Sequence, residues 1–85
     1  MNRRRLLRRL AQGRLQNVPF RDMVNLVEGY GFRLSRISSS HHIFVHPDIQ
    51  ELVNLQSDEG EAKPYQIRQF LRIVERYNLQ LREDR

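Results

Sequence analysis

All three histidines of this chain, His41, His42 and His46, lie within six consecutive positions, directly after a run of three serines. Imidazole is the side chain whose ordinary pKa lets it accept or donate a proton near neutrality. Hydroxyl groups and the backbone N–H groups of a turn can hold a phosphate beside it. Residues 38–46 are therefore the part of the sequence whose residue types suggest chemistry.

The spacing of the histidines disfavours a metal site. In a strand His42 and His46 lie about 13 Å apart, whereas one zinc ion needs its ligand nitrogens about 2 Å away. The neighbouring residues His41 and His42 point to opposite faces of a strand, and the chain has no cysteine to complete a ligand set. We expect no metal and no other cofactor.

Three roles remain open for these histidines: acid–base catalysis, non-catalytic nucleic-acid binding and a purely structural role. A histidine can take the proton of a ribose 2′-hydroxyl or give one to the leaving oxygen, with Arg36 and Lys63 as candidate electrophilic partners. Binding alone needs only cations on phosphates. For His46, beside Pro47, we favour a structural role at a strand end. No Ser-His-Asp order is readable, so a hydrolase with a covalent nucleophile is disfavoured.

The elements that must position this stretch follow from the apolar pattern. Helical spacing predicts an amphipathic helix over residues 2–14, a second from Pro19 to about Gly29, and a third from Pro64. Alternating or β-branched runs predict strands over 32–36, 42–46 and, shorter, 52–56, with a turn at 38–40 and a polar loop over 57–62. Three antiparallel strands under the two larger helices leave one sheet face open, where we expect the site.

Length and composition exclude several classes of protein. A chain of 85 residues predicts one compact domain, and the absence of cysteine excludes a disulfide framework. No apolar run approaches the roughly 18–20 residues of a membrane span. Arg8 and Arg9 interrupt the leading leucines, so no signal-peptide core forms. We expect a small, soluble, cytoplasmic protein with no membrane partner.

The net charge of +5 is unevenly distributed. The first fourteen residues hold six arginines and no acid, whereas the remainder carries nine basic and ten acidic residues. Arginine also outnumbers lysine by fourteen to one. Guanidinium groups bind phosphates and carboxylates in a bidentate manner, so this excess of arginine over lysine suits a polyanion or an acidic partner. An arginine-rich genome explains it equally well. The basic character therefore belongs to the predicted N-terminal helix and not to the histidine stretch.

Several ordered motifs resemble the HicA toxin family, the small ribonucleases of HicAB toxin–antitoxin pairs. Gly31-Phe32 matches the Gly-Phe pair that ends a helix in this family. Residues 40–47, SHHIFVHP, match the family's strand, which contains Ser-His and ends in His-Pro. Residues 54–56, NLQ, and 62–69, AKPYQIRQ, are similar to a longer-chain branch of that family. The resemblance extends from about residue 18 to residue 79.

The resemblance implies an α+β fold like that of the double-stranded-RNA-binding domain, α-β-β-β-α with a three-stranded antiparallel sheet. Residues 1–16 are then a basic N-terminal helix extension and residues 17–85 the ribonuclease domain. It further implies metal-independent cleavage of messenger RNA that arrests translation, with His41, the histidine after the family's Gly-Ser, as the catalytic residue. It also implies a HicB-like antitoxin as partner. Candidate RNA-binding residues are Ser40, His42, Arg36, Lys63 and Arg68.

Strand parity adds an expectation about the faces of the sheet. His41 shares a face with Ile43 and Val45, whereas Phe44 points the other way. If Phe44 faces the helices, His41 lies on the open face, and an antitoxin that covers this face would also cover the two exposed apolar residues. The sequence departs from the family where Ser39 replaces a glycine; a positive φ there would cost about 1 kcal/mol.

Two questions stay open at this point. The alternative to a ribonuclease is a module of the same fold that binds double-stranded RNA without cutting it, and a third class is a pure protein-interaction domain. The helix over residues 2–14 could dock on the domain through its leucines, contact RNA or an antitoxin through its arginines, or remain a solvated tail.

Overall fold

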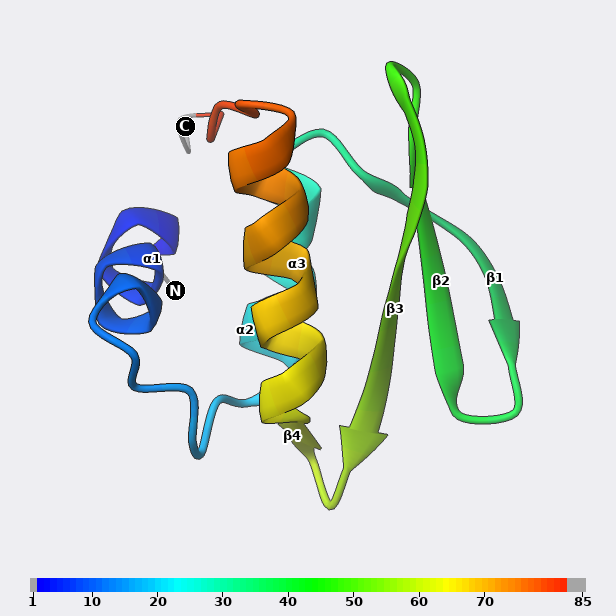
Figure 1. Ribbon diagram of the computed structural model, residues 1–85. Coiled ribbons are helices and arrows are strands. Elements are labelled where there is room, and N and C mark those ends of the chain that lie inside the picture. The colour runs from blue at the N-terminus through cyan, green and yellow to red at the C-terminus, as the bar shows by residue number, and fades with distance from the viewer. Residues whose placement is uncertain (1, 83–85) are drawn as a thin grey trace.

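The computed structural model describes residues 2–82 and shows an α+β fold (Figure 1). Its elements in chain order are α1 (Arg3–Ala11), α2 (Phe20–Gly29), β1 (Arg33–Ser38), β2 (His41–His46), β3 (Ile49–Asp58), β4 (Glu61–Ala62) and α3 (Pro64–Arg76). The order confirms the predicted fold class, including the extra N-terminal helix. Residue 1 of the predicted N-terminal extension (1–16) and residues 83–85 of the predicted domain (17–85) lie outside the described residues.

The sheet is fully antiparallel, with the strand order β1-β2-β3-β4. It has four strands where three were predicted, because residues 57–62 form the end of a hairpin and not a loop. Glu59 and Gly60 have φ values of 52° and 83°, the positive values that a two-residue type I′ turn requires. β3 is accordingly the longest strand, with 10 residues, and the prediction of a short strand over 52–56 was wrong.

The molecule has three layers (Figure 1). Helices α2 and α3 cover one face of the sheet, and α1 packs against α2 on the side away from the sheet. Phe44 of β2, Val53 and Leu55 of β3 and Phe70 of α3 are buried between the sheet and the helices. The other face of the sheet is left open, as predicted.

Strand β1 lies at the edge of the sheet, beyond the cover of the helices. All six of its residues are exposed, so the prediction of a half-buried strand at this position was wrong. Leu34 pairs with Phe44 and Ile37 with His42, which places both apolar side chains on the helix side of the sheet. They nevertheless remain 44% and 55% exposed, because α2 and α3 pack mainly against β3 and β4 at the other side of the sheet.

Helix α1 is part of the hydrophobic core and not a solvated tail. Leu6 and Leu10 are 7% and 2% exposed and belong to the same buried cluster as the residues of the sheet. Asn2 begins the helix, since its side chain accepts a hydrogen bond from the Arg5 backbone N–H. Gly13 ends this segment with a φ of 85°, a conformation that glycine adopts without strain.

The apolar stripes predicted for α2 and α3 face the core, with one exception. Met23 and Val27 of α2 and Ile67 and Phe70 of α3 are buried, whereas Tyr77, just past the end of α3, is 40% exposed. No helix within residues 2–82 is long and apolar enough to cross a membrane.

Candidate functional site

The open face of the sheet carries His41, the first residue of β2. His41 pairs with Gln56 of β3, and three positions further on Phe44, which is 1% exposed, faces the helices. Because successive strand residues alternate between faces, His41 and Ile43 lie on the side that no helix covers. The side chain of His41 is half-buried there, so it is held by its neighbours and still accessible to a substrate.

Two polar contacts surround His41. Its Nδ1 lies 3.2 Å from Oδ1 of Asn54, and Gln56 Nε2 donates a hydrogen bond to Ser40 Oγ at 3.0 Å. Asn54 and Gln56 alternate with the buried Val53 and Leu55 along β3. Asn54 and Gln56 are not among the predicted site residues, although polar residues at alternate positions of a partly buried strand are a readable signal.

The contact between His41 and Asn54 determines which ring nitrogen is available for chemistry. When Nδ1 carries the proton and donates it to Asn54 Oδ1, Nε2 keeps its lone pair and can accept a proton from a substrate. If the amide of Asn54 is turned, its NH₂ donates to Nδ1 and Nε2 carries the proton instead. The arrangement therefore orients the ring for either direction of proton transfer at Nε2.

Removing Asn54 is expected to lower the rate of any reaction that depends on His41 without unfolding the protein. In Asn54→Ala the ring loses the one side-chain hydrogen bond it makes in the described part of the chain, and misplacement of a catalytic group by about 1 Å can cost up to about 100-fold in rate. The change should lie in kcat and not in KM, because Asn54 acts through His41. Partial recovery in Asn54→Ser and none in Asn54→Leu would separate hydrogen bonding from packing; equal kcat for parent and Asn54→Ala would contradict this role.

The turn that leads into His41 is strained. Ser39 has a φ of 59°, a backbone conformation that residues other than glycine adopt at a cost of about 1–2 kcal/mol. It is the first residue of the two-residue connection between Ser38 and His41, which pair with each other. A type II′ hairpin turn prefers glycine at this position, so the departure of Ser39 from the family pattern falls where the backbone needs glycine.

Replacing Ser39 with glycine is expected to stabilise the protein by up to about 1 kcal/mol, because relief of the left-handed strain outweighs the entropy that glycine gains in the unfolded chain. Urea unfolding followed by circular dichroism measures the change. Ser38→Gly, at a neighbouring position without positive φ, is the control and should destabilise. A Ser39→Gly variant less stable than the parent would show that the turn is not strained by its side chain.

The other two histidines lie on the opposite face of the sheet from His41. The ring of His42 packs edge-on against Phe20 with centroids 4.8 Å apart, and its Nδ1 lies 3.3 Å from the Ser40 carbonyl oxygen. His46 is 9% exposed; its Nδ1 accepts a hydrogen bond from the Asp48 backbone N–H at 3.1 Å, and its ring contacts Phe32. His46 thus has the structural role expected at a strand end.

The predicted RNA-binding residues divide by position. Ser40 adjoins His41, and Arg36 pairs with Ile43, which places it on the open face. Lys63 immediately precedes α3, and Arg68 is exposed on its second turn. These two lie on the helix side of the molecule, with the beginning of α3 at the end of the sheet where His41 lies (Figure 1). Lys63, Arg68 and His42 therefore do not lie next to the His41 ring.

The open face also carries apolar side chains. Ile43 and Val45 of β2 are half-buried, and Leu52 of β3, on the same face as Asn54, is 54% exposed. Contiguous exposed apolar groups on a small protein mark a surface that a partner covers. A partner that covers them would lie directly beside His41.

The arginines of α1 lie away from this face. Helix α1 is separated from the sheet by α2 and α3 (Figure 1), and Arg5, Arg8 and Arg14 are exposed on it or just after it. A short RNA bound at His41 therefore cannot contact α1 at the same time. Any role of these arginines in binding concerns a second surface.

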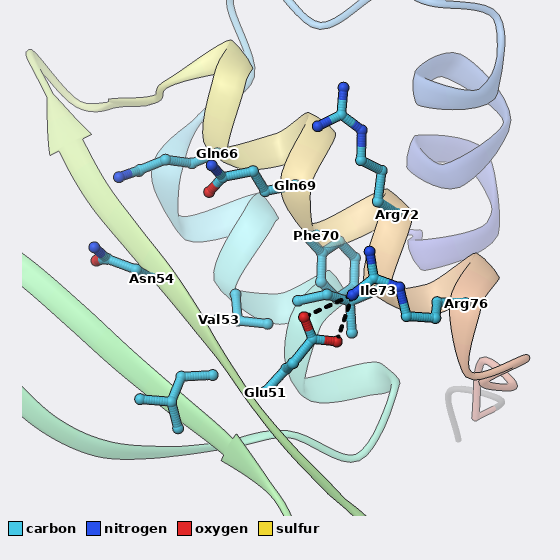
Figure 2. A pocket seen from close by; sticks show the side chains of 10 residues that line it. Glu51, Val53, Asn54, Gln66, Gln69, Phe70, Arg72, Ile73 and Arg76 are labelled. Carbon is cyan, nitrogen blue, oxygen red and sulfur yellow. Dashed lines mark hydrogen bonds and ion pairs between the residues drawn. The ribbon is translucent and has the colours of Figure 1, made fainter.

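A groove of about 270 Å³ lies between β3 and α3. Figure 2 shows Gln69, Arg72 and Arg76 of α3 along one side and residues 51–54 of β3 along the other. Arg76 donates to both carboxylate oxygens of Glu51, at 2.7 and 2.9 Å. Hydrogen bonds from Tyr77 and Arg76 lower the pKa of Glu51, and the ion pair of Glu51 with Arg76 links β3 to α3 beside the groove.

Within residues 2–82, no group of three or more histidine, cysteine, aspartate or glutamate side chains is placed to hold a metal ion. The side chains that converge on the open face are an imidazole, a hydroxyl and two amides, with Arg36 further along. This set can transfer a proton and contact a phosphate.

Comparison with known protein families matches most of the chain. The family described as HicA toxin of bacterial toxin–antitoxin matches residues 20–75, which include all of α2 and β1 to β4 and almost all of α3. No curated protein and no solved structure matches the chain. The matched region contains His41, Asn54 and the whole open face, and excludes α1.

Proposed function

The chain belongs to the HicA toxin family of bacterial toxin–antitoxin systems, and on that premise we propose that it cleaves messenger RNA with His41 as its acid–base residue. The observation that carries the proposal is the position of His41, accessible on the open face and oriented through Nδ1 by Asn54. Cleavage of messenger RNA would arrest translation, which is the effect expected of such a toxin.

The proposed reaction is an internal transfer at phosphorus. Nε2 of His41 takes the proton from a ribose 2′-hydroxyl, and the 2′-oxygen forms a bond to the adjacent phosphorus. The bond from phosphorus to the 5′-oxygen breaks, and this oxygen takes a proton from the imidazolium or from water. The products are a 2′,3′-cyclic phosphate and a 5′-hydroxyl, and no step needs a metal ion.

Neighbouring groups support this chemistry. The Ser40 hydroxyl and the backbone N–H groups of its turn can hold a phosphate oxygen, and Arg36 on the same face adds positive charge where the phosphorane gains negative charge. Because His42 and His46 face the helices, no second histidine can act as the general acid while His41 acts as the general base. We therefore propose a slow enzyme.

An antitoxin is the expected protein partner of this family, and we propose that a HicB-like antitoxin covers the open face. The apolar side chains of Ile43, Val45 and Leu52 lie on the same face as His41, with Ile43 nearest to it. A partner that buries them excludes RNA from the imidazole, so inhibition follows from occupancy alone.

A non-catalytic RNA-binding module is the second candidate, and the absence of a second histidine on the open face favours it. RNA integrity after incubation with the purified protein in EDTA separates the two. Cleavage by the parent and none by His41→Ala supports the enzyme. Retention of RNA by both proteins with cleavage by neither supports the binding module.

A further inference from the structure

The sheet ends at β3 over most of the length of that strand. β4 pairs only with Ser57 and Asp58, so residues 49–56 have no neighbouring strand on that side within the described chain. An unpaired edge presents backbone N–H and C=O groups to which another extended segment can bind. This edge also forms one wall of the groove in Figure 2.

The amide of Gln56 shows which backbone groups point outward. Its N–H donates to Gln66 Oε1 at 2.7 Å and not to β2, so Gln56 and His41 form a non-hydrogen-bonded pair. Such pairs alternate along an antiparallel ladder, and Asn54 and Leu52 therefore also direct their N–H and C=O groups away from β2. No other described segment binds these groups.

The chemistry of the groove selects for negative charge. Gln69, Arg72 and Arg76 project from α3 along its rim (Figure 2). Arg76 is already paired with Glu51, whereas Arg72 is exposed and has no ion-pair partner within residues 2–82. Arg72 and the amide of Gln69 are thus available to a carboxylate that lies beside β3.

A second copy of this chain suits the edge poorly. Pairing two copies through β3 would bring the arginines of both grooves together, in a protein that already carries a net charge of +5. The opposite edge strand, β1, has a register shift between Leu34 and Arg36, and β3 has one between its pairs with Phe44 and His46, so bulges favour neither edge. The β3 edge is distinguished by the adjoining groove that Arg72 and Arg76 line.

We infer that the free edge of β3 binds an extended segment of a partner protein that carries acidic side chains at alternate positions. Alternate side chains of the added strand point into the groove beside Arg72, and the others lie on the open face beside Leu52. Acidic residues fit the first set and apolar residues the second. The inference rests on the proposed function only for the identity of the partner, an antitoxin whose strand would extend the sheet that bears His41.

Amide hydrogen exchange of the ¹⁵N-labelled full chain tests this inference, with the synthetic peptide acetyl-VEVEVE-amide as probe and acetyl-KVKVKV-amide as control. The acidic peptide should slow exchange at Leu52 and Asn54 by about tenfold or more, whereas Val53 and Leu55, already bonded to β2, should be slow throughout. Arg72→Glu should weaken binding of the acidic peptide by about tenfold. Arg21→Glu, an equal charge reversal on the exposed side of α2, should leave it unchanged.

Unchanged exchange at Leu52 and Asn54 at saturating peptide, or protection of β1 instead, would overturn the inference. Protection of Leu52 and Asn54 that increases with protein concentration in the absence of peptide would also overturn it, because a second copy would then occupy the edge. RNA cleavage does not enter this measurement, so failure here is distinguishable from failure of the ribonuclease proposal.

Discussion

Replacement of His41 by alanine is expected to lower the rate of RNA cleavage in EDTA by about 100- to 10,000-fold, the range over which a positioned acid–base group contributes. No other histidine should rescue the activity of this variant. His42 and His46 both face the helices and cannot reach a substrate on the open face. Initial rates on a single fluorescent RNA, under saturating substrate, measure the effect on kcat.

The loss of activity should not reflect loss of the fold. His41 is half-buried at the beginning of β2, makes one side-chain hydrogen bond within residues 2–82, to Asn54, and is not a member of the buried core, so truncation removes little core packing. The urea midpoint of His41→Ala should stay close to that of the parent, and Arg21→Ala, on the exposed side of α2, should keep full activity. Cleavage by a folded His41→Ala protein at more than a tenth of the parent rate would contradict the catalytic assignment.

Leu10→Ala in α1 is expected to destabilise the protein by about 2–5 kcal/mol, the usual cost of truncating a buried leucine. Leu10 is 2% exposed and belongs to the common core. A small domain has only about 5–15 kcal/mol in total, so the thermal midpoint should fall by about 10 °C or more. Urea unfolding with a constant m value measures the change.

Arg8→Ala is the matched control for Leu10→Ala. Arg8 is exposed on the same helix, and surface substitutions usually change stability by less than about 0.5 kcal/mol. Equal stability of Leu10→Ala and the parent would show that α1 does not pack in solution as it does in the structure. Because Leu6 and Leu10 are core residues, charge-removing substitutions are a cleaner test of the arginines than deletion of residues 1–14.

The sequence predicted the elements that carry the site better than it predicted their surroundings. Alternation along residues 41–46 placed His41 opposite to Phe44, and burial of Phe44 then decides the face. The pattern could not show that β1 lies beyond the helices, because Leu34 alternates with polar residues as a covered strand residue would. Coverage depends on where α2 and α3 lie over the sheet, a tertiary property that the strand does not encode.

The missed features share a physical cause. β4 is two polar or small residues long, so it has no periodicity to detect, and its existence depends on positive φ at Glu59 and Gly60. Asn54 became a site residue only through the pairing register of β2 with β3, which brings it to His41. The groove beside β3 likewise arises from the shortness of β4 and the position of α3.

The chemical identity of the new RNA ends, determined after cleavage in EDTA, tests the central claim most directly. If His41 removes the proton of a 2′-hydroxyl, the ends are a 2′,3′-cyclic phosphate and a 5′-hydroxyl, and an RNA with a single 2′-deoxyribose at the cleavage site is not cut. A 5′-phosphate with a 3′-hydroxyl, or equal cleavage of the 2′-deoxy substrate, would mean that water and not the 2′-oxygen attacks phosphorus, and would contradict the account.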